Sequence, residues 1–442
     1  MAYTATSSTW LRGINKAQVY PTLDKDATAD VVIVGAGVAG TMAAYLLAKA
    51  GKKVILLDKN TIEYTTTAYT TGFITYILDT GISELVDMYG KANATKIWES
   101  SDKGIDLIEK IVKDEKIECE FKRVPEFVFA TSNSEWKGLE DEKKAADKVG
   151  FNSLKLHKKN TLPFKNSGAM EVPNQAKFHA IKFVIGLRKA AAKLGVEIHE
   201  QTEATRIVED EKRVVVRTKH TGSDSEATMH TVTAKDVVVM TYQPFNNPFP
   251  LFAHKGMYMS YVLELEIPSG AIAEGLYIDE QNPYHYFRID AGLGASKGTD
   301  RMIIGGEDQR SEIPHDPRRS YTAIEEYLAD ILPNLKYKIV TQWDGGILES
   351  IDGLPYIGRW SKDHPHHYVA TAFSGNGMQF SAVAGTIIRD LITGKDNPYA
   401  KVYDASRPTS IKNFGKKFID FGEEFFGGAV KNALRKKSGG KK

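Results

Sequence analysis

The chain has 442 residues, of which 42% are hydrophobic and 26% are charged, so it can bury a large core and we expect two domains rather than one. Its one cysteine, Cys119, excludes an intrachain disulfide and a cysteine-based metal cluster, and we predict no metal site. The net charge of +2 combines +6 over residues 411–442 with −4 over the rest, which does not indicate a nucleic-acid-binding body.

The first segment, residues 1–29, is predicted to form an arm on the surface. It has neither the basic region nor the apolar region of a signal peptide. Together with the single cysteine, this predicts a cytoplasmic location.

The next stretch, residues 30–58, has the order of a βαβ dinucleotide-binding unit. A β-branched run, Val31 to Val34, precedes the turn Gly35-Ala-Gly37-Val-Ala-Gly40, and a helix-length apolar segment, a second apolar run and Asp58 follow. Residues 31–48 are also uncharged and long enough for a membrane span. Three glycines in six residues, with a strand after them, fit a membrane helix poorly, so we favour the dinucleotide site.

Each glycine of this unit has a physical role. Gly35 lets the chain turn sharply after the strand, Gly37 leaves room for a pyrophosphate, and Gly40 lets the helix pack on the strand. The phosphates are expected at the helix N-terminus, beside Val38 and Ala39, among unpaired N–H groups.

The carboxylate of Asp58 is placed to accept both hydroxyls of an adenosine ribose, and it disfavours the 2′-phosphate of NADP. Lys59, next to it, belongs to the same predicted site. A hydroxyl-rich segment, residues 64–75, follows, and it is either a cofactor-contacting segment or a plain turn. Three of its residues are predicted to meet the cofactor: Thr70, Thr71 and Gly72.

From residue 81 onward the elements stop alternating β and α. Residues 81–117 are predicted to be helical, 119–130 to form a strand and 134–148 to form a polar helix. We therefore expect a second, α+β domain inserted into the first.

The dinucleotide-binding pattern resumes with an amphipathic helix over 178–194 that ends at Gly195. Alternating aromatic and aliphatic residues at 258–267 and 284–304 indicate strands of the second domain. The remaining predicted segments return to the first domain: strands at 196–200 and 237–241, a hairpin within 205–218, and the motifs at 351–358 and 368–377.

These motifs resemble those of the D-amino-acid oxidase/glycine oxidase family of FAD-dependent amine oxidoreductases. The resemblance covers roughly residues 8–407. Within the family, the chain looks most similar to the subgroup often fused to a C-terminal Rieske iron–sulfur domain, a domain we expect to be absent here. It is carried by Trp10…Tyr20-Pro, the fingerprint through Asp58, Phe178-His179, Ile303-Ile-Gly-Gly-Glu-Asp308, Trp343…Asp352-Gly-Leu-Pro-Tyr-Ile-Gly358 and Gly375-Asn-Gly-Met-Gln379.

The resemblance implies an α/β fold with a Rossmann-like FAD-binding domain and an inserted α+β substrate domain that holds a mixed antiparallel sheet. The FAD-binding domain is predicted to comprise residues 30–80, 165–245 and 340–407, and the substrate domain 81–164 and 246–339.

The family also implies that Ala204 lies near the adenine and that a glycine-rich turn contacts the flavin near its pyrimidine edge. A turn that opens a helix points N–H donors and a positive dipole at the negative charge of reduced flavin. Gly375-Asn-Gly377 alone would also fit an ordinary turn. The predicted flavin contacts are Gly375, Asn376, Gly377, Met378 and Gln379.

One departure from the family bears on the substrate. Glycine oxidases and D-amino-acid oxidases place a carboxylate-binding arginine after the Trp-x-Gly motif, where this chain has Ile347. Arg288, with Tyr286 near it on the predicted substrate sheet, is the candidate substitute, and an arginine paired on the sheet edge is the alternative. Lys255 is either a cation near the flavin or a solvated lysine. Cys119 matches no attachment position of the monomeric sarcosine oxidases, so FAD is expected to be non-covalent.

The predicted activity is oxidation of a C–N bond of a small amine or amino acid by hydride transfer to flavin N5, with oxygen or another acceptor taking the electrons. An FAD-dependent hydroxy-acid or polyol dehydrogenase is the alternative, and it would need a base such as His254 or His285. A third interpretation is a flavin-bound non-catalytic protein that docks a partner through its tail.

That tail, residues 408–442, combines basic charge with phenylalanines at helical spacing: Phe414, Phe418, Phe421 and Phe425. The pattern predicts either a helix docked on the body or peripheral attachment to an anionic membrane, on the cytoplasmic face.

Overall fold

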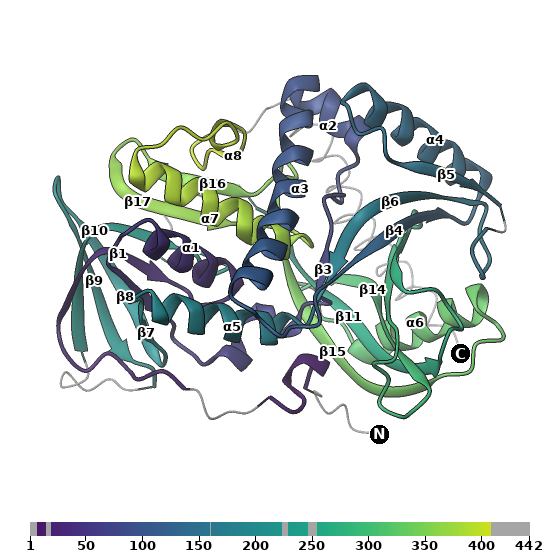
Figure 1. Ribbon diagram of the computed structural model, residues 1–442, viewed down its shortest axis with the longest axis horizontal. Helices are drawn as coiled ribbons and strands as arrows, with labels where there is room; N and C mark the ends of the chain where they lie inside the picture. Colours follow the sequence, from purple (N-terminus) through teal and green to yellow (C-terminus); the bar gives the residue numbers. More distant parts are fainter. Residues whose placement is uncertain (1–6, 15–18, 160, 223–228, 246–253, 408–442) are drawn as a thin grey trace, which may run out of the picture.

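The fold is described by a computed structural model over residues 7–14, 19–159, 161–222, 229–245 and 254–407. Figure 1 shows two lobes, each built on a sheet, with helix α3 (Lys91–Asp114) running between them. The phenylalanines and basic residues of the predicted tail lie outside the described residues.

The first sheet has the strand order β16-β17-β10-β1-β2-β7. Its inner pairs are parallel, and the antiparallel strands β8 and β9 extend from β10. The strands are β1 (Ala27–Val34), β2 (Val54–Leu57), β7 (Glu197–His199), β8 (Thr202–Glu209), β9 (Val214–His220), β10 (Met229–Val239), β16 (Tyr356–Ser361) and β17 (His364–Thr371).

The sequence of β1 explains how this sheet is buried. Val31 and Ile33 belong to the core formed with the helices, whereas Val32 and Val34 pack with residues of β8, β9 and β10. Because successive side chains of a strand point to opposite faces, a strand covered on both faces is apolar throughout. The helices on the first face are α1 (Val38–Lys49), α5 (Ala180–Lys193) and α7 (Gly377–Thr393).

The second sheet is mostly antiparallel and has the order β15-β11-β14-β13-β12-β4-β6-β3, with β5 beside β6. The pair β12–β4 is parallel. The strands are β3 (Phe73–Ile74), β4 (Lys122–Ala130), β5 (Lys155–Lys158), β6 (Gly168–Lys177), β11 (His254–Pro268), β12 (Gly275–Asp279), β13 (His285–Asp290), β14 (Thr299–Arg310) and β15 (Lys338–Ser350).

Further helices cover the second sheet and complete the molecule. Helix α6 (Pro317–Ile331) packs on β11 and β14 through Ile324 and Leu328. Helix α4 (Asn133–Lys148) begins with a capping box between Ser132 and Glu135 and packs on β4 and β6. The remaining helices are α2 (Ile82–Tyr89) and α8 (Ala400–Tyr403), with short 3₁₀ turns at Thr9–Leu11, Ile62–Tyr64 and Thr66–Tyr69.

The predicted α/β fold with a second, mixed sheet is confirmed, but sheet membership differs from the predicted division of the chain. Strands β6 and β15 come from segments assigned to the FAD-binding domain, and both are hydrogen-bonded into the second sheet. Helix α3, assigned to the substrate domain, packs on α7, where a Cβ at Gly104 would lie 2.8 Å from the carbonyl oxygen of Gln379. A strand's alternation indicates a buried face and does not identify its partner strand.

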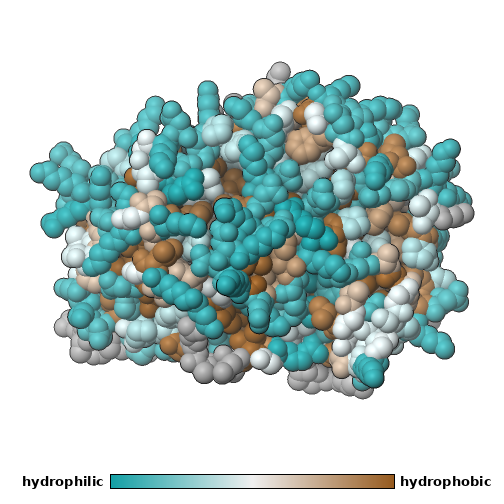
Figure 2. Space-filling model, in the orientation of Figure 1, coloured by the Kyte–Doolittle hydropathy of each residue, from teal (hydrophilic) through white to brown (hydrophobic). Residues whose placement is uncertain are grey.

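The surface is largely hydrophilic in the view of Figure 2, with hydrophobic residues showing between the polar side chains. Exposed large hydrophobic residues such as Val19, Tyr64 and Met229 come from separate segments. Within the described ranges, no helix has both the length and the apolar composition that a bilayer crossing requires.

Candidate functional site

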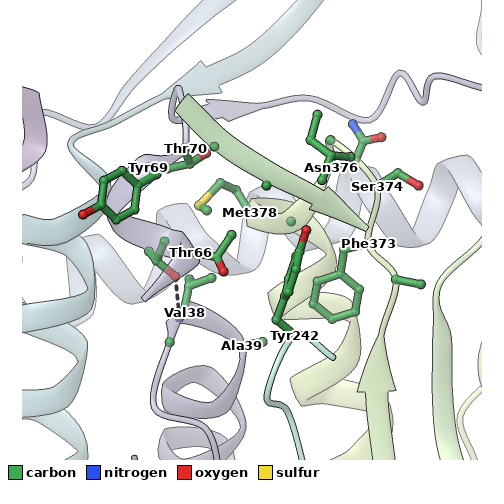
Figure 3. Close-up of a pocket in the computed structure, with 18 of the residues that line it drawn as sticks. Val38, Ala39, Thr66, Tyr69, Thr70, Tyr242, Phe373, Ser374, Asn376 and Met378 are labelled. Carbon is green, nitrogen blue, oxygen red and sulfur yellow. Dashed lines mark hydrogen bonds between the residues drawn. The ribbon is translucent and has the colours of Figure 1, made fainter. Parts of the chain in front are cut away.

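A cavity of about 1140 Å³ opens where the two sheets meet. Its walls come from the start of α1, from residues 64–71, from the second sheet and from the turn before α7. Figure 3 shows that Val38, Thr66, Tyr69 and Met378 converge on it from these segments, and that Tyr242 joins them from the segment after β10. The cavity therefore joins the predicted dinucleotide site to the predicted substrate sheet.

The glycine-rich turn forms one end of the cavity. Gly35 has a φ of +103°, and a Cβ there would lie 2.3 Å from the carbonyl oxygen of Met240. A Cβ at Gly40 would lie 1.7 Å from the carbonyl oxygen of Gly35, so only glycine lets α1 approach the strand this closely. Gly37 caps α1 without a side-chain hydrogen bond, and it lines the cavity with Ala39. The positive end of α1 is thus directed at the cavity.

The first N–H group of helix α1 donates a hydrogen bond to a neutral hydroxyl group. The backbone N–H of Val38 donates to Thr67 Oγ1 over 3.1 Å, the dashed contact in Figure 3. Thr70 and Thr71 also line the cavity, in agreement with the predicted contacts of the hydroxyl-rich segment.

Asp58 lies at the end of β2, where the cavity begins. Its carboxylate accepts hydrogen bonds from the backbone N–H groups of Ala36 (2.7 Å) and Asn60 (2.9 Å). Burial raises the pKa of this carboxyl, and the two hydrogen bonds oppose the rise. Lys59 and Ala204 line the same region. These are the positions predicted to meet an adenosine.

A buried ion pair contacts the backbone of the glycine-rich turn. Arg188 on α5 donates to Glu200 Oε1 (2.6 Å) and to the carbonyl oxygen of Ala36 (2.5 Å), between Gly35 and Gly37. Glu200 also accepts from the backbone N–H of Tyr20. Sequence analysis did not single out these side chains, because neither lies in a recognised motif.

The turn before α7 forms the other end of the cavity. Gly375, Asn376, Gly377 and Met378 line it, as Figure 3 shows for Asn376 and Met378. The Asn376 side chain donates to the carbonyl oxygen of Ile77 (3.1 Å) and does not cap α7, so a second helix N-terminus faces the cavity.

Two residues that were predicted to contact the cofactor do not line the cavity. Gln379 is 1% exposed and is not among the residues that line the cavity. Gly72 has a φ of +72°, and a Cβ there would lie 2.7 Å from Arg288 Nη1 and 2.9 Å from the carbonyl oxygen of Phe178. Gly72 therefore serves the packing of Arg288 rather than the cavity, and both predictions are corrected.

Arg288 was predicted as a carboxylate anchor, and the structure contradicts this. It is 1% exposed and does not line the cavity. Nε and Nη2 donate to Asp290, and Nη1 donates to the carbonyl oxygens of Thr71, Gly72 and Phe178 at 2.9–3.1 Å. A guanidinium with this set of partners has no donor group directed at a substrate. The alternative of a paired arginine is the better description.

Tyr286 does line the cavity, on β13. Its hydroxyl lies 3.0 Å from Ser260 Oγ, and the neighbouring Tyr284 donates to Asp308 over 2.8 Å. Burial raises the pKa of both phenols, so they are neutral hydrogen-bonding groups at physiological pH. Lys255 lies in β11, and its side chain falls outside the described part of the structure.

Of the two histidines proposed as bases, His285 does not line the cavity. The His285 ring is buried and stacks on Tyr327, and its Nε2 atom lies 3.1 Å from Glu307 Oε1. Burial alone would lower its pKa, but contacts with Asp279 and Glu307 raise it overall. The side chain of His254 falls outside the described part of the structure.

Glu126 is a cavity residue that sequence analysis missed. Glu126 on β4 is 2% exposed, lines the cavity and accepts a hydrogen bond from the Thr75 hydroxyl. Burial raises the pKa of this carboxyl to about 7, and the nearby charge of Asp79 adds to the rise. The signal in the sequence was a lone acid at the start of the strand-like run Glu126-Phe-Val-Phe-Ala.

A family model for FAD-dependent oxidoreductases (DAO) matches residues 30–391 of this chain. The chain belongs to this family. Its relatives include the "Putative Rieske 2Fe-2S iron-sulfur protein YhfW" of Bacillus subtilis, 28% identical over 88% of this chain and 73% of that protein. The gamma-glutamylputrescine oxidoreductase of Escherichia coli is 25% identical over 88% of this chain and 89% of that protein.

Among solved structures, glycine oxidase from Geobacillus kaustophilus shares the fold, with a TM-score of 0.73, 19% identity and coverage of 87% of this chain and 100% of that chain. The cavity of this DAO-family chain fits FAD on its own geometry. A glycine cradle, a buried carboxylate after β2 and two helix N-termini surround one continuous space.

Proposed function

We propose that this protein binds FAD without a covalent bond and oxidises a C–N bond of a small amine or amino acid. The observation that carries the proposal is the single cavity that runs from the Gly35–Gly37 turn past Met378 to Tyr286 on the second sheet. FAD, when bound, supplies the hydride acceptor. The chain's task is to bind, orient and desolvate the substrate beside it.

Residues from several segments of the cavity wall would hold the cofactor. The backbone of Gly35, Gly37, Val38 and Ala39 would hold the diphosphate at the α1 N-terminus, and Asp58 with Lys59 would hold the ribose. Ala204 would contact the adenine, Thr70 and Thr71 the central part, and Gly375 to Met378 the flavin ring.

Non-covalent binding is supported by the residues that line the cavity. Among the described lining residues there is neither a cysteine nor a histidine. Cys119 is 1% exposed and lies away from the cavity, and burial raises the pKa of its thiol to about 12. A thiol in that state is a poor nucleophile.

Amine oxidation is favoured over alcohol oxidation because a named relative is an oxidoreductase of gamma-glutamylputrescine, and because hydride loss from a neutral amine needs no base. A C–OH bond needs a base to take the hydroxyl proton, whereas a neutral amine already carries the lone pair that drives hydride loss. Tyr286, Ser260 and the apolar Ile347 can position such a substrate and exclude water. Oxygen or another acceptor would then take the electrons.

The test is anaerobic bleaching of the bound flavin by a panel of amines, D- and L-amino acids and hydroxy acids. We expect an amine or amino acid to bleach the flavin and to release ammonia or a shortened amine. Bleaching by hydroxy acids alone would establish the alcohol dehydrogenase instead. Flavin that no compound reduces, although dithionite does, would favour a non-catalytic role.

A further inference from the structure

The substrate end of the cavity has an acidic wall. Glu126 reaches it from β4, and the structure shows no hydrogen-bond partner for its Oε1 atom among the described residues, while Oε2 accepts from Thr75. A carboxylate that is 2% exposed and lines a cavity with one free oxygen is set to bind a cationic group there.

A second carboxylate lies close by. Asp79 also lines the cavity, and a Cβ at Gly375 would lie 3.6 and 3.7 Å from its two carboxylate oxygens. Asp79 is near enough to Glu126, Tyr284 and Tyr286 to raise the pKa of each. The two acids therefore belong to the end of the cavity formed by the α7 turn and the second sheet, away from Asp58.

Positive charge is scarce at this end among the residues that the structure describes. Among the described residues that line the cavity, the one lysine or arginine is Lys59, and it follows Asp58 at the opposite end. Ile347 lines the cavity where the family's amino-acid oxidases have an arginine, and Arg288 is held by Asp290 and three carbonyl oxygens. A substrate carboxylate would meet the like charge of Glu126 at this end of the cavity.

We propose, resting on the oxidation proposed above, that the substrate is a cationic aliphatic or arylalkyl amine with no carboxylate on the reacting carbon, and that Glu126 binds its ammonium group and takes up one proton from it, which leaves the neutral amine that loses hydride. Asp79 adds negative potential beside the flavin turn. Tyr286 and Ser260 complete a wall that offers the amine neutral hydrogen-bonding groups.

The test uses matched pairs of probes that differ by one carboxylate: 1,4-diaminobutane against ornithine, 2-phenylethylamine against phenylalanine, and propylamine against 2-aminobutyrate, with both enantiomers of each amino acid. Binding to the FAD-loaded protein is measured by anaerobic calorimetry, and flavin reduction is followed separately. We expect at least one amine to bind about tenfold or more tightly than its carboxylate partner, the scale of one charge-assisted contact.

Two variants test whether Glu126 and the residue at position 347 cause the preference for amines over amino acids. Glu126→Gln keeps the size and the contact with Thr75, and it should weaken amine binding about tenfold. Ile347→Arg should weaken amine binding and strengthen binding of the amino acid. Glu171→Gln is the control, because Glu171 lies on the adjacent strand β6, pairs with His157 and does not line the cavity.

The outcomes separate this inference from the proposed function. Amino acids that bind as tightly as their amines and reduce the flavin would keep the oxidation and overturn the cationic substrate. Amine binding that depends on Glu126 without any flavin reduction would keep the cation site and overturn the oxidation. Amine binding that is unchanged in both Glu126→Gln and Ile347→Arg would overturn the assignment to this wall.

Discussion

Replacing Glu126 by glutamine should make the folded protein more stable at alkaline pH. In the folded state, burial and Asp79 raise the pKa of this carboxyl from 4.5 to about 7, and Thr75 offsets only part of the rise. An unfolded glutamate ionises near its ordinary value. Between these pH values the folded state holds a proton that the unfolded state has lost, so Glu126 destabilises the fold progressively as the pH rises.

The magnitude follows from the two pKa values. One pKa unit corresponds to about 1.4 kcal/mol, so ionised Glu126 lowers the free energy of unfolding by about 3 kcal/mol above pH 7. Between about pH 5.5 and pH 8.5 this destabilisation grows by about 2 kcal/mol. Glutamine has no charge to bury and can still accept from Thr75, so Glu126→Gln removes the pH-dependent part.

The assay is thermal melting of the FAD-loaded wild type and variant at several pH values in this range. The melting temperature of Glu126→Gln should rise relative to wild type with increasing pH. Glu171→Gln, which removes a carboxylate outside the cavity on the neighbouring strand, should show no such relative gain. A difference between wild type and Glu126→Gln that stays constant or falls as the pH rises would refute the reasoning.

Four further results are expected. Asp58→Ala removes charge-assisted hydrogen bonds to the ribose, so FAD affinity should fall about tenfold or more in an equilibrium dialysis measurement; unchanged affinity would place the adenosine elsewhere. Arg288→Met leaves buried Asp290 without its bidentate partner and should cost about 3 kcal/mol of stability, whereas Arg318→Met, which breaks an exposed pair with Asp316, should cost little. Acid precipitation should release all FAD into solution, and flavin in the pellet would disprove non-covalent binding. A chain stopped at Pro408 should lose pelleting with anionic vesicles if the tail attaches to membranes, and equal pelleting of both forms would remove that hypothesis.

The cofactor end of the site could be predicted from the sequence because its determinants are local. Gly35, Gly37 and Gly40 are required by close approaches within one βαβ unit, and Asp58 follows the second strand of the same unit. Such a unit has a fixed order of elements and turn geometry, so its chemistry is visible in a single stretch of the chain. The turn before α7 could also be predicted from the sequence, because Gly375 and Gly377 lie at the start of a helix.

The substrate end was decided by tertiary structure. Arg288 and Glu126 both lie on strands of the second sheet, and the sequence favoured the first as the functional group. The fold surrounds Arg288 with Asp290 and the carbonyl oxygens of distant segments, and it leaves Glu126 at the cavity wall. A strand's alternation states which residues share a face, but the partner strands and the packed loops determine whether that face meets a counter-charge or a cavity. The charge at this end of the cavity is therefore a property of how the two sheets meet.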